Sequence, residues 1–274
     1  MIKDLLLVID ISTNDDAIVA AAVRMAGHHQ AHLSVALLSV IPVPDYTVMV
    51  FPPYVTLDEY REKAEAKERS VRDRAARAGV DVEIRILSDT ARVLLDKTPA
   101  QTRYADLVLF GPPATWEDEW LRRRVLENVI LGSGRPVLSL PLDGTVPSFE
   151  RAVIGWNAGP EATRAIQVAL PHLSAHADVV VAIVNPETSA DHHGSDPGAD
   201  IACHLARHGL RVDVATTTAH SGAEAEALRA MAADRGVDLL VLGAFARSRL
   251  RELILGGVTE DMIGTVATPT LLMH

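Results

Sequence analysis

The chain has 274 residues, of which 48% are hydrophobic and 23% charged, and its net charge is −10. The length is about twice that of a common domain, and the composition is typical of folded globular proteins and excludes wholesale disorder. Because both halves are acidic and aromatic residues make up only 4%, we do not expect a nucleic-acid-binding protein.

The N-terminal apolar run, Leu5–Ile9, predicts a first strand rather than a signal peptide. This run and the others in the chain are far shorter than the roughly 20 residues of a membrane-spanning helix. The single cysteine, Cys203, gives no indication of an oxidising compartment. We therefore expect a cytoplasmic protein without a membrane partner.

The first half of the chain alternates apolar segments with segments of helical periodicity. We predict strands near 5–10, 33–40, 82–88, 106–110 and 136–140, and helices near 14–28, 57–78, 91–102 and 117–130. The strands are rich in Val and Leu without strict alternation, which indicates burial on both faces. This order predicts an α/β domain with a doubly wound, mainly parallel five-stranded sheet.

The second half repeats the first. Asp10 and Asn157 each follow the first strand of their half, and a similar apolar run follows both Asp106 and Asp238. The predicted strands lie near 152–156, 178–184, 211–216, 238–242 and 269–273, and the helices near 160–175, 197–209, 222–235 and 249–265. We infer one duplicated unit, with domains at 1–142 and 151–274.

Ligands of parallel sheets bind at the carboxyl ends of the strands. In the second half these ends carry Val153-Ile-Gly-Trp-Asn157 and Gly243-Ala-Phe-Ala246, followed by Gly256-Gly257-Val-Thr259, and the chain closes on Thr268-Pro-Thr-Leu-Leu-Met. With these segments the chain resembles the universal stress protein family in its tandem two-domain form. The resemblance implies Rossmann-like domains, similar to the adenine nucleotide alpha hydrolases. It also implies an internal pseudo-dimer that pairs through strands 136–140 and 269–273.

The ATP-binding branch of this family carries two glycines separated by two residues and, after nine further residues, Gly-Ser/Thr. Here Gly243 and Gly256 match, while Ala246 and Gly257 depart from the pattern. Glycines admit a close approach of ribose and phosphates, and N–H groups at a helix start favour anions. Gly257 keeps the N–H without the hydroxyl, which Thr259, beyond Val258, is close enough to supply.

The resemblance places the nucleotide base near Asn157 and near the backbone of Ile183. Asn157 stands where ATP-binding members commonly have Asp, which the first copy keeps as Asp10. The first copy has Arg124-Val-Leu126 in place of Gly257-Val-Thr259 and so lacks a phosphate loop. We expect a nucleotide site, with Mg²⁺, only in the second domain.

Structural explanations stay open for these residues. Gly243 suits a sharp turn, Gly256-Gly257 suits a helix bend or close packing between the copies, and Trp156 is expected in the core or at a domain contact.

A histidine-rich group is a candidate zinc site. His204 and His208 share a predicted helix face, with Cys203 beside them and His192 and His193 upstream. No Cys-x-x-Cys or His-Glu-x-x-His motif accompanies them, and we assign no metal. We also assign no catalytic residue, because the motifs of hydrolases and P-loop enzymes are missing.

The sequence therefore predicts a universal stress response protein whose second domain senses adenine nucleotide and signals to another protein, with a homodimer as a further possibility. Two alternatives stay open: a scaffold that binds no nucleotide, and a slow metal-assisted ATPase.

Overall fold

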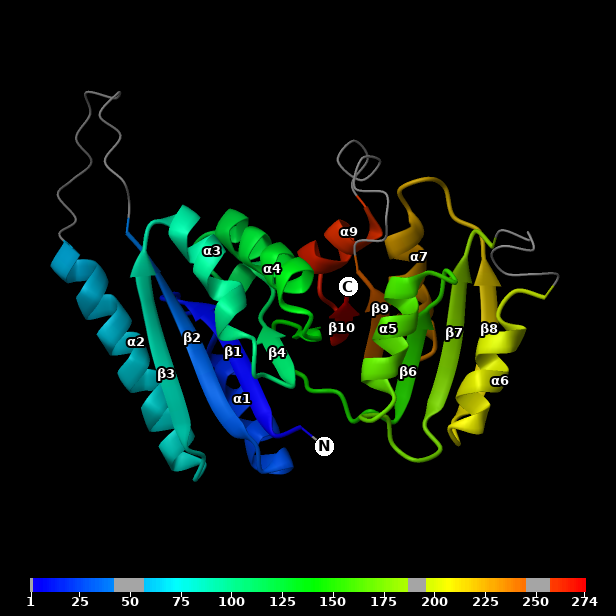
Figure 1. Ribbon diagram of the computed structural model, residues 1–274, viewed down its shortest axis with the longest axis horizontal. Coiled ribbons are helices and arrows are strands. Elements are labelled where there is room, and N and C mark those ends of the chain that lie inside the picture. Colours follow the sequence, from blue (N-terminus) through cyan, green and yellow to red (C-terminus); the bar gives the residue numbers. More distant parts are fainter. Residues whose placement is uncertain (1, 42–56, 187–195, 245–256) are drawn as a thin grey trace. The chain divides into compact units, whose positions relative to one another are not determined.

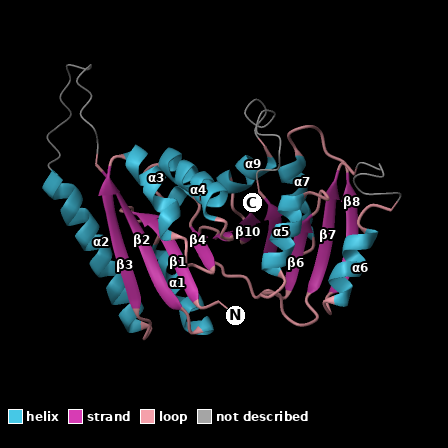
Figure 2. Cartoon of the chain, viewed as in Figure 1, coloured by secondary structure: helices cyan, strands magenta, loops and turns pink. Residues whose placement is uncertain are grey.

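A computed structural model describes residues 2–41, 57–186, 196–244 and 257–274 (Figure 1). Strands and helices alternate along the chain (Figure 2). The chain divides into two compact units, one of residues 2–135 and 142–144 and the other mainly of 136–141 and 145–274. Within the described residues, no helix is both long and apolar enough to cross a membrane.

The first unit has the strand order β3-β2-β1-β4, and all these pairs are parallel. Its strands are β1 (Asp4–Asp10), β2 (His32–Val40), β3 (Val82–Asp89) and β4 (Leu107–Phe110). Its helices are α1 (Asp16–His29), α2 (Leu57–Arg77), α3 (Ala91–Gln101), the short 3-10 helix η1 (Pro113–Thr115) and α4 (Glu119–Ser133). Helices α1 and α2 contact each other, as do α3 and α4, and Figure 1 shows α1 behind the sheet and α3 and α4 in front of it. The unit is doubly wound, as predicted.

The second unit repeats this order as β8-β7-β6-β9-β10, again with parallel pairs. Its strands are β6 (Arg151–Gly155), β7 (Asp178–Val184), β8 (Arg211–Thr217), β9 (Leu239–Gly243) and β10 (Thr270–Met273). Its helices are α5 (Pro160–Ala169), α6 (Ala199–Arg207), α7 (Glu224–Asp234) and α9 (Val258–Gly264). Helix α5 is shorter than predicted because Pro171, without an N–H, cannot continue it.

Strand β5 (Val137–Ser139), which we predicted as the last strand of the first copy, lies in the second compact unit. It pairs antiparallel with β10, with Leu138 opposite Leu271. All three residues of β5 are buried. The predicted pairing of the two last strands is therefore present.

Burial differs between the strands. Every residue of β4 and β10 is buried. The edge strands β3 and β8 keep half-exposed and charged positions, such as Glu83, Arg85 and Asp213. Charged side chains on an edge strand oppose pairing with another chain.

Candidate functional site

A cavity of about 280 Å³ lies at the carboxyl ends of β6, β7 and β9 in the second unit. The strand order reverses between β6 and β9, because β7 lies on one side of β6 and β9 on the other. Open α/β sheets bind ligands at this switch point. The wall consists of Gly155, Trp156, Asn157, Ala162, Ala182, Val184, Glu224, Leu228, Leu242, Gly243, Val258 and Thr259.

The turn from β6 into α5 fixes the orientation of Asn157. Its Oδ1 accepts a hydrogen bond of 3.0 Å from Gly159 N–H, and Ala158 between them has φ 55°. Gly159 then caps α5, and Pro160 occupies the first turn, where no N–H is needed. Within the described residues the Asn157 amide nitrogen has no hydrogen-bond partner, so it is available as a donor.

Gly243, at the end of β9, is explained by packing. A Cβ added there would lie 2.4 Å from Ala162 N and 2.6 Å from Glu161 C. These are backbone atoms at the start of α5, which cannot move aside without moving the helix. The glycine therefore permits α5 to approach β9 and, at the same time, forms part of the cavity wall.

Glu224 is the first residue of α7. Among the described residues, it is the one acidic residue that lines the cavity. Its Oε2 accepts a hydrogen bond of 2.8 Å from Gly222 N–H. The side chain is half-buried, and its other oxygen has no partner in the part of the chain that the structure describes.

The other polar groups of the wall are the indole of half-buried Trp156 and the hydroxyl of buried Thr259. No lysine, arginine or histidine lines the cavity in its described part. The remaining lining side chains are small or apolar. This wall suits a flat, largely uncharged group with a few hydrogen-bonding positions.

Four of the predicted site residues, Asn157, Gly243, Val258 and Thr259, line this one cavity. Gly257 directly precedes Val258, and Ile183 is buried between the lining residues Ala182 and Val184. Ala246 and Gly256 lie outside the described residues.

Two lining residues with polar groups, Trp156 and Glu224, are not among the predicted site residues. We expected Trp156 in the core or at a domain contact, and sequence reasoning did not single out Glu224. The position of Glu224 just after the third strand of its domain was an available signal, because the carboxyl ends of parallel strands meet at one edge of the sheet.

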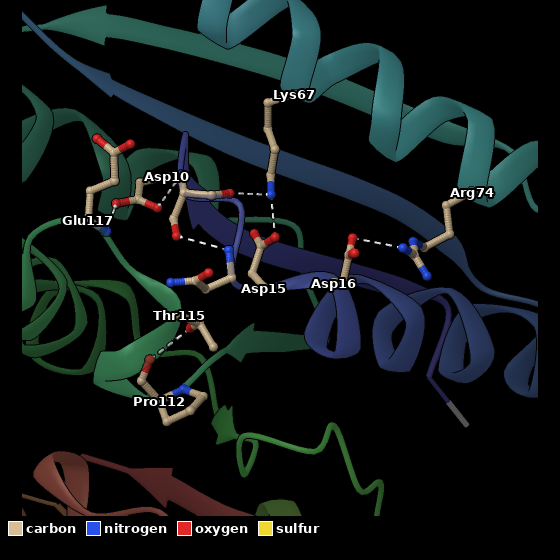
Figure 3. A network of polar contacts seen from close by, with 10 residues as sticks. Asp10, Asp15, Asp16, Lys67, Arg74, Pro112, Thr115 and Glu117 are labelled. Carbon is tan, nitrogen blue, oxygen red and sulfur yellow. Dashed lines mark hydrogen bonds and ion pairs between the residues drawn. The ribbon is translucent and has the colours of Figure 1, made fainter.

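In the first unit, Asp10 stands at the position equivalent to Asn157, and its contacts are different (Figure 3). Both oxygens of buried Asp10 accept backbone hydrogen bonds, one from Ser12 N–H at 3.0 Å and one from Glu117 N–H at 2.8 Å. Glu117 follows η1, so the segment after β4 lies directly on Asp10. Asp10 therefore holds its own chain at the position where Asn157 faces a cavity.

Neighbouring side chains extend this packing. Trp116 is buried and stacks on Phe110. Buried Arg122 donates from Nε to Gly111 O at 2.7 Å, and burial lowers its pKa to about 10. Val125 and Leu126, which replace Val258 and Thr259, are fully buried.

Helix α2 supplies a buried cation to the same region. Lys67 Nζ donates to Ser12 O at 2.5 Å and forms an ion pair with Asp15, as Figure 3 shows. Both charged side chains are buried. Burial raises the pKa of Asp15, and Lys67 opposes this rise.

The buried carboxyl group of Asp10 should make the free energy of unfolding depend on pH. Burial raises the pKa of Asp10 to about 6, although the two N–H donors lower it. An unfolded Asp ionises near pH 4, so between about pH 4 and 6 the folded chain keeps a proton that the unfolded chain has lost. The free energy of unfolding therefore falls as pH rises through this window, by at most about 1.4 kcal/mol per unit for this group.

We expect Asp10→Asn to flatten this part of the profile. Urea unfolding from pH 4 to 7, in a Trp156→Phe background whose remaining tryptophans both lie in the first unit, measures it. Parallel profiles for the chains with and without the Asp10→Asn substitution would contradict the assignment.

The histidine-rich group does not assemble into a metal site among the described residues. His204 and His208 form an edge-to-face pair with ring centroids 4.8 Å apart, and Cys203 is exposed. His192 and His193 lie outside the described residues.

Comparisons with known proteins agree with this fold. A model of the universal stress protein family matches residues 1–141 and 148–274. No curated protein matches the chain. A universal stress protein from Archaeoglobus fulgidus DSM 4304 is 17% identical, with a TM-score of 0.71 over 98% of this chain and 95% of that one. A putative universal stress protein from Pseudomonas aeruginosa UCBPP-PA14 is 13% identical, with a TM-score of 0.54 over 99% and 93%. At these identities the two structures support the fold alone.

Proposed function

Because the chain belongs to the universal stress protein family, we propose that its second domain binds an adenine nucleotide and acts as a sensor or adaptor. The observation that carries this proposal is the cavity at the β6/β9 switch point, whose wall contains four residues chosen from sequence. Its volume of about 280 Å³ is near the lower end for small-molecule sites, about 300–1,000 Å³. This is room for the nucleoside part of a nucleotide.

The roles of the wall residues follow from their chemistry. The Asn157 amide donates to the base or ribose, and Gly243 forms part of the wall that the ligand contacts. Val258 and Thr259 bring the start of α9 to the same cavity. A ligand that contacts both the turn after β6 and the start of α9 stabilises the conformations in which these two segments lie together. A partner protein that binds these conformations would therefore bind more of the chain when nucleotide is present.

The first domain has a structural role in this proposal. Asp10 uses both oxygens within its own chain, and the positions equivalent to Val258 and Thr259 are buried. One nucleotide, with its Mg²⁺, is therefore expected per chain.

Trp156 provides the test. We expect ATP, ADP or AMP with Mg²⁺ to change tryptophan fluorescence and to raise the thermal midpoint, since a ligand that binds only the folded state stabilises it. In Trp156→Phe the midpoint should still rise while the fluorescence change is lost. If no adenine nucleotide shifts the midpoint of the wild-type chain, the scaffold alternative replaces this proposal. Phosphate release above background that persists on further purification would instead indicate the ATPase.

A further inference from the structure

We propose, on the premise that the cavity binds a nucleotide, that Glu224 selects the base: it accepts a hydrogen bond from an exocyclic amino group and so favours adenine over hypoxanthine. The proposal rests on the position of this carboxylate, on its free oxygen and on the apolar surfaces beside it.

Glu224 begins α7, which packs against β7. It is four residues before Leu228, so both side chains lie on the same face of α7, and both line the cavity. Leu228 reaches to within 3.7 Å of the position that a Cβ on Gly155 would take. Ala182 and Val184 of β7 and the Trp156 indole complete an apolar and aromatic surface that suits a flat base.

The charge of Glu224 orients the ligand. A carboxylate on the wall, with no ion-pair partner in the described chain, repels phosphate groups. The phosphates are therefore expected away from Glu224, and the base beside it.

Hydrogen-bond direction then decides which base fits. An ionised carboxylate only accepts hydrogen bonds. Gly222 N–H occupies Oε2 and leaves Oε1 for a donor on the ligand, while the Asn157 amide nitrogen is a donor on the same wall. An acceptor and a donor together complement the amino group and ring nitrogen of adenine. Hypoxanthine carries a carbonyl oxygen in place of the amino group and a hydrogen on the ring nitrogen N1. In the orientation of adenine, its oxygen would face the Glu224 acceptor and its N1–H would face the Asn157 donor, so both contacts would be mismatched.

The test compares ATP with inosine triphosphate (ITP) by calorimetry, using the full chain with Mg²⁺. We expect wild type to bind ATP about tenfold or more tightly than ITP, because a hydrogen bond to a charged group is lost with ITP. In Glu224→Gln the side-chain oxygen keeps the Gly222 contact and the amide nitrogen faces the ligand as a donor. The ATP-to-ITP ratio should then fall at least about tenfold, to equal or inverted preference.

Glu226→Gln is the matched control, because Glu226 is an exposed residue on the same turn and does not line the cavity. It should keep the wild-type ratio. If Glu224→Gln binds both nucleotides with the wild-type ratio of affinities, the proposal that Glu224 selects the base is wrong, whereas the proposed nucleotide site is not contradicted. If wild type binds neither nucleotide, the proposed function itself fails.

Discussion

Replacing Val258 by Trp should reduce the affinity for ATP by about 100-fold or more. Val258 is the first residue of α9, is half-buried and lines the cavity of about 280 Å³. An indole at this position occupies space that the nucleoside needs, and overpacking a well-fitted site is strongly unfavourable. Calorimetric titration of wild type and variant with ATP and Mg²⁺ measures the loss.

Gly264→Trp is the control for this variant. Gly264 ends the same helix, and a Cβ added to it meets no atom within 4 Å. It should bind ATP as wild type does. Wild-type affinity in a Val258→Trp chain whose thermal midpoint is unchanged would show that ATP does not bind in this cavity.

The second large effect is expected at the buried ion pair of the first domain. Lys67→Met leaves the Asp15 carboxylate buried without its cation and removes the hydrogen bond to Ser12 O. Removing one partner of a buried pair costs about 3–5 kcal/mol, whereas replacing both by apolar side chains is often close to neutral. We therefore expect Lys67→Met to lower the free energy of unfolding by about 3 kcal/mol and Lys67→Met with Asp15→Leu to recover most of it.

Urea unfolding in the Trp156→Phe background follows the first domain alone. Arg69→Met is the control on the same helix, since the Arg69 side chain is 68% exposed and its ion pair with Glu65 is at the surface. It should change stability by less than about 0.5 kcal/mol. Equal losses in the single and double variants would contradict the attribution of the loss to an unpaired buried carboxylate.

The sequence predicted much of this architecture because the duplicated strands carry strong signals. Runs such as Leu107–Phe110 and residues 239–242 are apolar throughout and are buried in the sheet as expected. The family model matches both halves and confirms the resemblance. Helix ends were less well predicted, and α5 ends at Ala169 rather than near 175, since local breakers such as Pro171 outweigh periodicity.

The site was predicted only in part, for a physical reason. Asn157 and Gly243 sit at strand ends with residue types that suggest a ligand, and they meet at one cavity. Glu224 and Trp156 have ordinary residue types in ordinary local sequence, and their role depends on which strand ends lie side by side. Asp10 accepts hydrogen bonds from both Ser12 N–H and Glu117 N–H. The second bond joins residues 107 positions apart, and no local sequence pattern reveals such a contact.

The number of nucleotides bound per chain tests the central claim most directly. Calorimetry of the full chain with ATP and Mg²⁺ should give one site, which Val258→Trp removes and Asp10→Asn leaves intact. Two sites, or one site that Val258→Trp leaves unchanged, would contradict a single nucleotide site in the second domain.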